Sequence, residues 1–348
     1  MDPRNDDPGD RSSPIPNPVP GLGGESSPPR VTVVVPAKNE GARIGNCLRS
    51  IHAQSLKAIE IIVVDGRSAD RTAEIARGNG AIVLFEDYHT RAGACQVGLM
   101  GARGDYVAFT DADCNPDPQW LEALLPHLSS TVAGAGGRIV NEGNSYWSKA
   151  VDDALDTLLG SANSVQGRNF PDVRDVSSIS GCNSMYRTSD LKAVGGFRTE
   201  YLTAEDTELN RRLLRRGRLV YVPDAVVVHR HGRGLRAFAK RMYQYGYGRG
   251  QVLLPGPPVI LPVAAPAMVL TFVLWPAFAW ALLGAYGAVV AFSALTAAVR
   301  KRRVRYLPAI PVVYVIEHAA YVVGFWVGVG HRLSRALRKP RPQGGAAP

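Results

Sequence analysis

The sequence predicts an α/β domain with a largely parallel sheet, followed by membrane helices. Three observations support this prediction. From Val31 to Phe109, short β-branched runs alternate with helix-like segments. Acidic residues directly follow three of these runs, and residues 251–299 include no Asp, Glu, Lys, Arg or His. Such alternation is typical of right-handed crossovers that cover both faces of a parallel sheet, whereas a long uncharged stretch is typical of membrane spans.

The alternating elements follow one another closely. Strands are expected where short apolar runs end at turn residues, at 31–35, 59–64, 81–85 and 105–109. Helix-like segments lie between them and end near Gln54, Arg77 and Met100. Ser68 or Asp70 could cap the second of these helices.

Three loops should meet at one edge of this sheet, residues 36–40, 65–70 and 111–113. Loops at the carboxyl ends of parallel strands line the ligand crevice of such folds. Asp111 and Asp113 are two residues apart, so in an extended segment both side chains could face one hard cation. Asp pairs also cap turns, and Asp65 alone fits a turn residue equally well. Acidic residues after three strands together favour a nucleotide site.

Length and composition narrow the class of protein. The chain has 348 residues, 46% of them hydrophobic, which is enough for about two cooperative units. Residues 1–29 are rich in Pro, Gly, Ser and Asp and predict a disordered tail, with no signal peptide. The domain of residues 30–234 is therefore expected on the cytoplasmic side. Four cysteines without zinc-ligand spacing are expected to be reduced thiols: Cys47, Cys95, Cys114 and Cys182.

The formal net charge of +10 comes from basic clusters late in the chain, at 211–249 and 300–341. They stand beside apolar segments and carry no nucleic-acid motif. This placement favours contact with anionic lipid and phosphorylated ligands, without nucleic acid as a partner. Residues 235–255 are expected to form an interfacial basic and aromatic segment.

The membrane region is expected to cover residues 256–331. As one helix, the uncharged run from Gln251 to Val299 would be on the order of 70 Å long, against a hydrocarbon core of ~30 Å. A hairpin of two spans is the simplest packing, and the positive-inside rule returns the basic loop of residues 300–305 to the cytoplasm. Pro266 and Pro276, with Gly284 and Gly287, offer places to kink or turn.

A third apolar stretch, residues 306–330, carries Glu317 and His318 near its middle and precedes a basic tail at 332–348. A full crossing would place this tail outside, against the positive-inside rule. A re-entrant or interfacial helix is therefore preferred, with Glu317 and His318 facing protein or headgroups, although a third span stays open.

The segments at 33–40, 63–72 and 111–113 resemble, in order and spacing, the nucleotide-sugar motifs of glycosyltransferase family 2. The resemblance continues through 195–197, 205–209 and 221–225 and covers residues 31–231, well over half of the chain. It implies the GT-A fold, a Rossmann-like nucleotide-binding half joined to an acceptor half, with C-terminal transmembrane helices here. The layout is similar to membrane-anchored transferases of exopolysaccharide and lipid-linked glycan assembly.

The activity implied by this resemblance is an inverting, metal-dependent transfer of one sugar. The donor would be a nucleotide-sugar, and the acceptor a lipid-linked molecule, either polyprenyl phosphate or a polyprenyl-diphosphate glycan, at the cytoplasmic membrane face. The partners would also include membrane lipids. Pocket shape rather than motif type selects the sugar, the base and the acceptor.

On the donor side, the resemblance assigns the nucleoside to the loop that contains Pro36, Ala37 and Glu40. Asp65 would accept a hydrogen bond from the base, and Glu40 would lie near the base or ribose. Arg91 would reach the diphosphate, although a solvated surface arginine is an equal alternative.

The resemblance implies that Asp111, Ala112 and Asp113 bind the nucleotide-sugar, and that Asp111 and Asp113 also ligate a metal ion. Asp113 is the preferred ligand of a Mg²⁺ or Mn²⁺ ion that bridges the diphosphate, and Asp111 would point toward ribose or water. His229 resembles the late metal-binding histidine of the fold, with His231 as its competitor and a structural role as the alternative for each.

On the acceptor side, the family pattern makes Asp206 the catalytic base and Glu205 its orienting neighbour. The alternative is that both simply interact with a helix dipole. Gly181, Cys182 and Asn183 should form the floor of the acceptor and sugar site, where the glycine allows close backbone approach.

Residues 238–249 depart from the family in one respect. Processive members such as cellulose and hyaluronan synthases carry Gln-x-x-Arg-Trp, whereas the segment from Arg241 to Tyr245 has only a related composition. This argues against processive polymerisation. Arg241 and Arg249 are candidates for binding a diphosphate or lipid phosphate, with headgroup contact as an equal alternative.

Two other functions compete with sugar transfer. A sugar-nucleotide pyrophosphorylase shares the alternating architecture but would need a glycine-rich activating loop with a lysine, which Pro36 to Gly41 lacks. A non-catalytic membrane scaffold with a degenerate transferase domain is disfavoured because the full acidic set is present.

Overall fold

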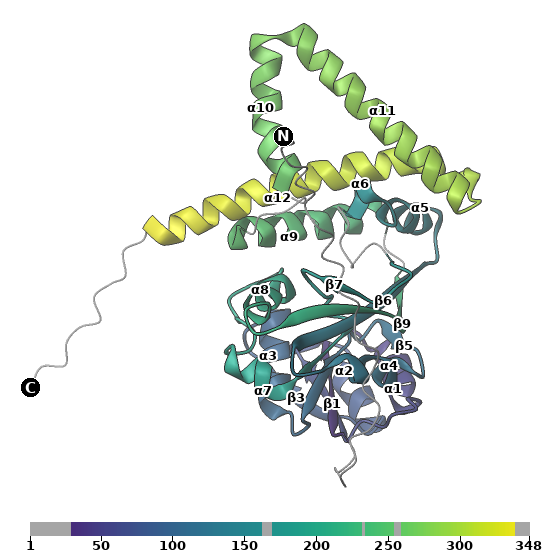
Figure 1. Cartoon of the computed structure of the whole chain (residues 1–348), viewed down its shortest axis with the longest axis vertical. Helices are drawn as coiled ribbons and strands as arrows, with labels where there is room; N and C mark the ends of the chain where they lie inside the picture. Colours follow the sequence, from purple (N-terminus) through teal and green to yellow (C-terminus); the bar gives the residue numbers. More distant parts are fainter. Residues whose placement is uncertain (1–28, 162–168, 232–233, 254–258, 338–348) are drawn as a thin grey trace, which may run out of the picture.

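The computed structural model describes residues 29–161, 169–231, 234–253 and 259–337. It consists of a sheet domain below and a group of long helices above it (Figure 1). The expected disordered tail, apart from residue 29, and the end of the expected basic tail lie outside the described residues.

The first half of the sheet confirms the strand and helix alternation. Four strands run parallel in the order β3-β2-β1-β4: β1 (Val31–Ala37), β2 (Glu60–Asp65), β3 (Ile82–Phe85) and β4 (Tyr106–Phe109). The helices between them are α1 (Ile44–His52), α2 (Thr72–Gly78) and α3 (Arg91–Gly101). Side chains alternate across β1, so Val33 and Val35 join the core with α1, whereas Val34 joins the core with α3. Both faces of this half are therefore covered.

The second half of the sheet is mixed, which corrects the expectation of a largely parallel sheet. Its strands are β5 (Cys114–Pro116), β6 (Val132–Gly143), β7 (Arg174–Val176), β8 (Ser184–Arg187) and β9 (Arg218–His231). The full order is β3-β2-β1-β4-β8-β6-β9-β5, with β7 also paired to β9. β8 is antiparallel to both β4 and β6, whereas β6 and β9 are parallel. The strand and helix alternation stops after β4, and antiparallel neighbours need no crossover helix.

Three short helices and one 3₁₀ turn lie against this half of the sheet: α4 (Trp120–Leu124), α7 (Thr188–Ala193), α8 (Glu205–Leu213) and the turn at Leu125–His127. Two others, α5 (Tyr146–Leu155) and α6 (Leu158–Ser161), follow β6 and lie beside the upper helices, as does the 3₁₀ turn at Val304–Tyr306 (Figure 1). α8 begins with the acidic pair that the sequence singles out as catalytic.

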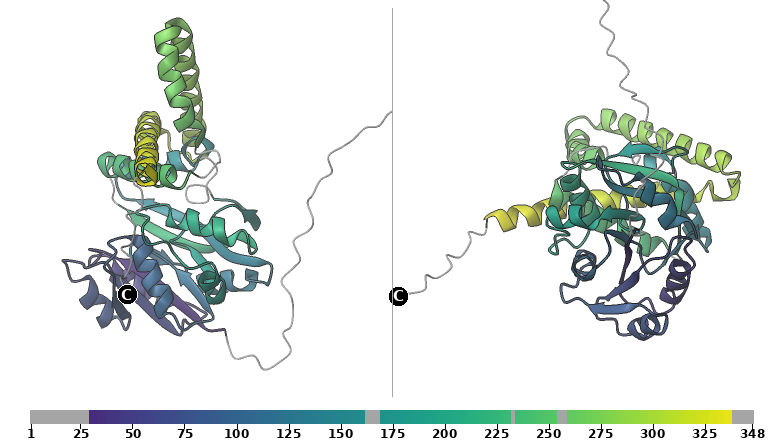
Figure 2. Two further views of the ribbon diagram at one scale, coloured as in Figure 1. Left: turned by 90° about the vertical axis from the view of Figure 1, so that its left-hand side faces the viewer. Right: turned by 60° about the horizontal axis from the view of Figure 1, so that its bottom comes forward.

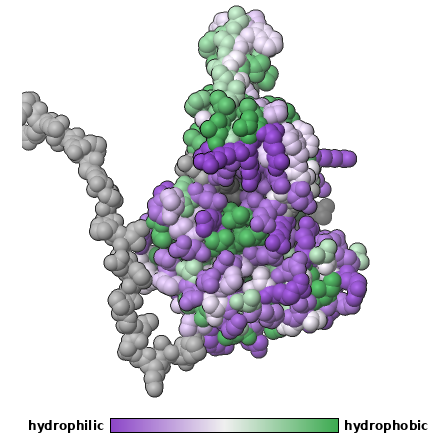
Figure 3. Space-filling model, turned by 90° about the vertical axis from the view of Figure 1, so that its right-hand side faces the viewer, coloured by the Kyte–Doolittle hydropathy of each residue, from purple (hydrophilic) through white to green (hydrophobic). Residues whose placement is uncertain are grey.

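Four longer helices form the upper layer: α9 (Leu235–Val252), α10 (Ile260–Leu274), α11 (Pro276–Arg300) and α12 (Ala309–Leu337). α10 and α11 form an arm that stands away from the sheet domain, whereas α12 lies along α9 (Figures 1 and 2). Figure 3 shows that the arm is coloured mainly as apolar and the sheet domain mainly as polar.

The lengths of these helices alter the expected two-span hairpin. α11 and α12 are long and apolar enough to cross a membrane by length and composition, but α10 has only 15 residues. At 1.5 Å per residue it measures about 22 Å, which is short of the ~30 Å hydrocarbon core. The chain turns at Trp275, with Pro276 as the first residue of α11, where a proline costs no hydrogen bond.

The basic loop between α11 and α12 is attached to the sheet domain. Arg300 and Lys301 contact Asp156 at 3.1 and 2.5 Å, and Arg303 contacts Asp153 at 3.2 Å. Since both aspartates lie in or directly after α5, this loop and the sheet domain stand at the same end of α11.

α9 and α12 pack with backbone contact along glycine faces. A Cβ atom at any of four positions would lie 2.1–2.2 Å from a carbonyl oxygen of the other helix: Gly246, Gly250, Gly324 and Gly328. The contacts advance in the same direction, from Tyr243 against Gly324 to Tyr247 against Gly328, so the two helices are parallel. We call this contact the glycine seam. Small residues spaced by four allow such close approach of two helices.

Candidate functional site

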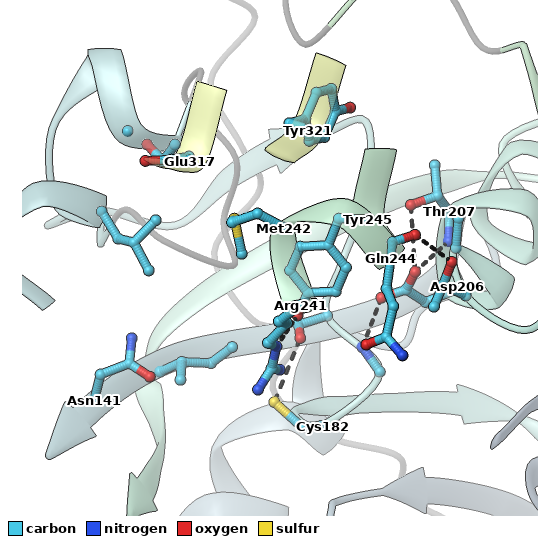
Figure 4. Close-up of a pocket in the computed structure, with 18 of the residues that line it drawn as sticks. Asn141, Cys182, Asp206, Thr207, Arg241, Met242, Gln244, Tyr245, Glu317 and Tyr321 are labelled. Carbon is cyan, nitrogen blue, oxygen red and sulfur yellow. Dashed lines mark hydrogen bonds between the residues drawn. The ribbon is translucent and has the colours of Figure 1, made fainter. Parts of the chain in front are cut away.

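One cavity of 1820 Å³ lies between the strand ends of the sheet and α9. It extends from the loops after β1 and β2 to the helices of the upper layer. Figure 4 shows Arg241 and Tyr245 of α9 above Cys182, with Asp206 on one side and Glu317 of α12 on the other. Pockets for drug-sized ligands usually occupy about 300–1,000 Å³, so there is room for more than one ligand.

The loops after β1 and β2, which the sequence predicts to bind the donor, form one end of this cavity. They are tied together, since the Asn39 N–H donates to Ser68 Oγ at 2.8 Å and the Ala69 N–H donates to Asn39 Oδ1 at 2.8 Å. Asn39 and Arg67 both have a positive φ, 55° and 59°, which turns the chain sharply after each strand. This confirms that the two loops meet at one sheet edge.

The nucleoside candidates differ in their access to the cavity. Pro36, Ala37 and Glu40 line it, whereas Asp65 does not. Asp65 is 1% exposed, and its Oδ1 accepts the Ser68 N–H at 2.7 Å. This contact fits the alternative interpretation of Asp65 as a turn residue. Burial raises the pKa of Glu40 even though Arg43 holds its carboxylate at 2.6 Å.

Arg91 bridges two of the acidic motifs. Its Nη2 lies 2.6 Å from Asp111 Oδ1, and its Nη1 lies 2.7 Å from Glu205 Oε1. Gly181 packs directly on this guanidinium, because a Cβ there would lie 2.6 Å from Arg91 Nη1. Arg91 is therefore a partly buried, paired residue and not the solvated arginine of the alternative interpretation. It joins β4, α3 and α8 at the centre of the cavity.

An Arg91→Met variant should be destabilised by about 3 kcal/mol, because it leaves Glu205 buried without its cation. Burial already raises the pKa of Glu205 above its ordinary value of 4.5, although Arg91 acts to lower it. A carboxyl whose pKa is raised in the folded state contributes to stability at low pH, where it is protonated, and loses this contribution as pH rises through that pKa. Without Arg91, the ionised form of Glu205 would be less stable still. The deficit of the variant should therefore be larger at about pH 7 than at about pH 4, as measured by chemical denaturation.

The matched control for this prediction is Arg71→Met. Arg71 pairs with Glu74 at 2.6 Å, but both side chains are mostly exposed. An exposed pair contributes ~0–1 kcal/mol, so this variant should unfold close to the wild type at both pH values. If both variants lost the same free energy of unfolding, the ion pairs of Arg91 would contribute no more to stability than an exposed pair.

Asp113 faces His229 rather than Asp111. Asp113 Oδ2 lies 3.2 Å from His229 Nε2, and His229 Nδ1 lies 3.0 Å from Asn141 Oδ1. Burial would raise the pKa of Asp113, but the hydrogen bond and charge of His229 outweigh it and leave the pKa below its ordinary value. The side chain of His231 lies outside the described residues.

The separation of Asp111 from Asp113 corrects the expectation that both face one cation. The segment after β4 is a turn, closed by the Cys114 N–H donating to Asp111 O at 3.0 Å. The alternation of side chains in an extended strand does not apply there. Asp111 is instead directed to Arg91, and it does not share a ligand group with Asp113 in the described part of the chain.

The donor set around Asp113 fits a divalent cation. Ligand atoms of Asp113, Cys114 and His229 lie within 4.8 Å of one another. Mg²⁺ and Mn²⁺ prefer carboxylate oxygens, Mn²⁺ also accepts imidazole, and a neutral thiol is a poor ligand for either. Asn141 meets the other ring nitrogen of His229, as outer partners of metal-binding histidines commonly do. Asp113 and His229 are therefore the residues that could hold the ion.

α8 presents the acidic pair at its first turn. Asp206 Oδ1 accepts the Thr207 N–H at 2.6 Å, and its Oδ2 accepts the Gly181 N–H at 3.3 Å. Ala204, directly before the pair, has a φ of 64°, a left-handed conformation that is costly for a residue other than glycine. This bend turns Glu205 toward Arg91 while Asp206 lines the acceptor part of the cavity.

Two of the three residues expected at the floor of the acceptor site line the cavity. Gly181 and Cys182 line the cavity, but Asn183 is fully buried. Its Oδ1 accepts from Trp120 Nε1 at 2.8 Å, and its Nδ2 donates to two backbone carbonyl oxygens. Asn183 is therefore corrected from an acceptor-binding residue to one that joins strands, because its amide hydrogen bonds are already used.

All four cysteines are free thiols, as expected.

α9 forms the roof of the cavity. Arg241 and Arg249 both line it, and their assignment to the acceptor stays a prediction. Arg241 Nε donates to Tyr245 Oη at 2.6 Å. Burial opposes the charge of Arg241, but Tyr245 and the carboxylates of Asp111 and Asp113 outweigh it and raise its pKa. A permanent cation thus stands above the two aspartates.

A Gly324→Leu variant should lose most of its activity and about 2 kcal/mol or more of stability. The new side chain would meet the Tyr243 carbonyl at the glycine seam, since even its Cβ would lie 2.1 Å away, so α9 and its Arg241 must move. Gly330→Leu, on the same helix, meets nothing within 4 Å and is the control. Thermal unfolding and sugar transfer are measured on both variants. If Gly324→Leu matched Gly330→Leu in both, the glycine seam would have no such role.

Several lining residues were assigned no role from the sequence: Glu86, Asn141 and Tyr245. Tyr245 follows Arg241 by four residues, a helical spacing that could have indicated the pair. Asn141 offers no comparable signal, because it reaches His229 only through the pairing of β6 with β9.

Comparison with known proteins gives matches over the same region. Residues 32–195 match the family described as Glycosyl transferase family 2. The chain is 33% identical over 228 residues to the pre-mycofactocin glycosyltransferase of Mycobacterium tuberculosis, which covers 62% of this chain and 46% of that protein. It is 28% identical over 325 residues to the succinoglycan biosynthesis protein ExoA of Rhizobium meliloti, covering 84% and 93%.

The fold is also similar to that of a solved enzyme. A mannosyltransferase from Pyrobaculum calidifontis, in complex with GDP-Man and Mn²⁺, superposes with a TM-score of 0.57 at 21% identity, over 87% of this chain and 88% of that one. This likeness shows the GT-A fold. The chain spans about half the length of the mycobacterial relative.

Proposed function

We propose a lipid-directed sugar transfer for this chain, which belongs to glycosyltransferase family 2. The donor would be a nucleotide-sugar bound at the loops after β1 and β2, and the acceptor a lipid-linked molecule. The similarity to the succinoglycan biosynthesis protein and to the mycobacterial glycosyltransferase supports a place in glycan or polysaccharide assembly.

One observation carries this proposal. A single cavity is lined at one end by the donor loops and at the other by apolar residues of the arm, such as Leu261 and Phe292. Arg91 and the acidic pair of α8 line the same cavity. An acceptor with an apolar chain could therefore reach the donor without leaving the apolar helices.

The chain's own groups suit a single displacement. Asp206 would take the proton of the acceptor hydroxyl as its oxygen bonds to the anomeric carbon. The bond from that carbon to the diphosphate oxygen breaks at the same time, so the nucleoside diphosphate leaves with the bonding electrons and the configuration inverts. Glu205 and Arg91 would hold α8 in position for this attack.

The charge of the departing diphosphate needs cations. Arg241 supplies one from the roof of the cavity. Asp113 and His229 would hold a Mg²⁺ or Mn²⁺ ion, which neutralises phosphate charge as a Lewis acid when bound.

The placement of the arm supports a membrane location. α11 and α12 are long and apolar, and the basic loop of residues 300–305 lies beside the sheet domain. Basic loops favour the cytoplasmic side, so we propose that the domain stands at the cytoplasmic face. α12 runs along α9 over the sheet domain, which supports an interfacial placement of this helix (Figure 1).

Membranes that contain the full chain test this proposal. They are incubated with Mn²⁺ and labelled UDP-, GDP- or dTDP-sugars, and the lipids are extracted. We expect one donor to label the lipid fraction, and both excess chelator and the Asp206→Asn variant to remove the label. Label in water-soluble products alone, with every donor, would contradict a lipid-linked acceptor.

A further inference from the structure

The upper end of the cavity contains a carboxyl group that the proposed transfer does not use. Glu317 of α12 lines the cavity, is 7% exposed, and its Oε2 has no hydrogen-bond partner. Within the described residues, Glu317 forms no ion pair with a Lys, Arg or His. A buried polar group without a partner is costly, and binding of a partner would relieve that cost.

The neighbouring polar side chains form hydrogen bonds with other groups and not with Glu317. His318 Nε2 lies 3.3 Å from the Leu159 carbonyl oxygen and must donate to it, whereas His318 Nδ1 lies 2.8 Å from Tyr286 Oη. Nδ1 can then accept the phenolic proton, which fits a neutral imidazole. Tyr314 Oη is likewise 2.8 Å from hydroxyls of Ser293 and Thr157.

The surroundings of Glu317 select the chemistry of its missing partner. Apolar side chains of the arm line the same part of the cavity, including Leu261, Val289 and Phe292. A carboxyl group there can accept a hydrogen bond from a neutral donor, and it offers no positive charge to a phosphate. The apolar walls suit an alkyl or isoprenoid chain next to that donor.

We propose that Glu317 binds a hydroxyl group carried on the apolar part of the acceptor, and so selects hydroxylated amphiphiles over anionic ones at this end of the cavity. This inference rests on the proposed function, because it names the chemistry of the acceptor. The phosphate of a lipid carrier would then lie toward Arg241 and Arg249, away from Glu317. The hydroxyl belongs either to a sugar or to an alcohol, two sources with the same chemistry.

Equilibrium binding to the full chain in phosphatidylglycerol nanodiscs tests the inference, with empty nanodiscs as the blank. The probes are tritiated decyl glucoside, decanediol and decyl phosphate. Glu317→Leu should weaken decyl glucoside binding about tenfold, the scale of one buried hydrogen bond, and leave decyl phosphate unchanged. Glu317→Gln should lose less, because its amide can still accept a hydrogen bond.

Val315→Leu is the control, since Val315 is 53% exposed and does not line the cavity. Nucleotide binding with Mn²⁺ should stay unchanged in all three variants, which shows that they fold. A similar loss for decanediol would support the inference and assign the hydroxyl to an alcohol, whereas a loss confined to the glucoside would assign it to a sugar. Unchanged glucoside binding and unchanged decanediol binding in Glu317→Leu, or a loss confined to decyl phosphate, would overturn it. Binding needs no turnover, so this result is independent of whether sugar transfer occurs.

Discussion

An Asp113→Asn variant is expected to lose sugar transfer by about a thousandfold or more while it keeps its fold. The change removes one of the two groups that could hold the cation, and a bound metal supplies several kcal/mol of charge stabilisation to such a reaction. Asn is close to Asp in size, and His229 can still contact its amide oxygen. The loss should therefore appear in catalysis and not in thermal unfolding.

Nucleotide binding separates this explanation from general damage to the site. The variant should bind the nucleotide more weakly than the wild type when Mn²⁺ is present and equally well in chelator, because the nucleoside loops lie elsewhere in the cavity. Asp224→Asn, an exposed aspartate on the same strand as His229, is the control. Wild-type turnover that persists in excess chelator would refute the metal role.

An Asp206→Asn variant should retain its affinity for the donor and lose turnover by about a hundredfold or more, the usual scale for a general base. Its amide oxygen can still accept the Thr207 N–H, so the start of α8 should be preserved. The amide cannot take the proton of the acceptor hydroxyl.

Separate measurements of donor Kd and kcat test this assignment. Glu200→Gln, which neutralises an exposed carboxylate shortly before α8, should match the wild type in both. If Asp206→Asn mainly weakened donor binding, Asp206 would belong to the donor site and another group would have to act as the base.

The sequence predicted the donor half of the fold because its signals are local. β-branched runs and turn residues specify β1 to β4, and parallel strands bring their following loops to one edge whatever the rest of the chain does. The same reasoning placed Pro36, Glu40 and Asp113 at the cavity, where the structure has them.

The residues whose structure differs from the expectation are those whose contacts depend on partners far apart in the sequence. Asn183 stands beside Cys182 in the chain, but Trp120 and two backbone carbonyls from other segments use its amide. Asp111 turns to Arg91 because the segment after β4 is not extended. Side-chain periodicity cannot reveal either contact, because each arises only when strands and helices far apart in sequence pack together.

The glycine seam has a consequence for how the protein is made. Ribosomes add about 5–20 residues per second, so α9 emerges several seconds before the helix that contains Gly324 and Gly328. Until that last helix docks, the glycine face of α9 has no partner, and Arg241 above the aspartates is not held in place. The nascent chain can thus fold its sheet early, but its catalytic chamber closes only after synthesis of the final helix. Completion of the chamber is in this way coupled to completion of the C-terminal helices.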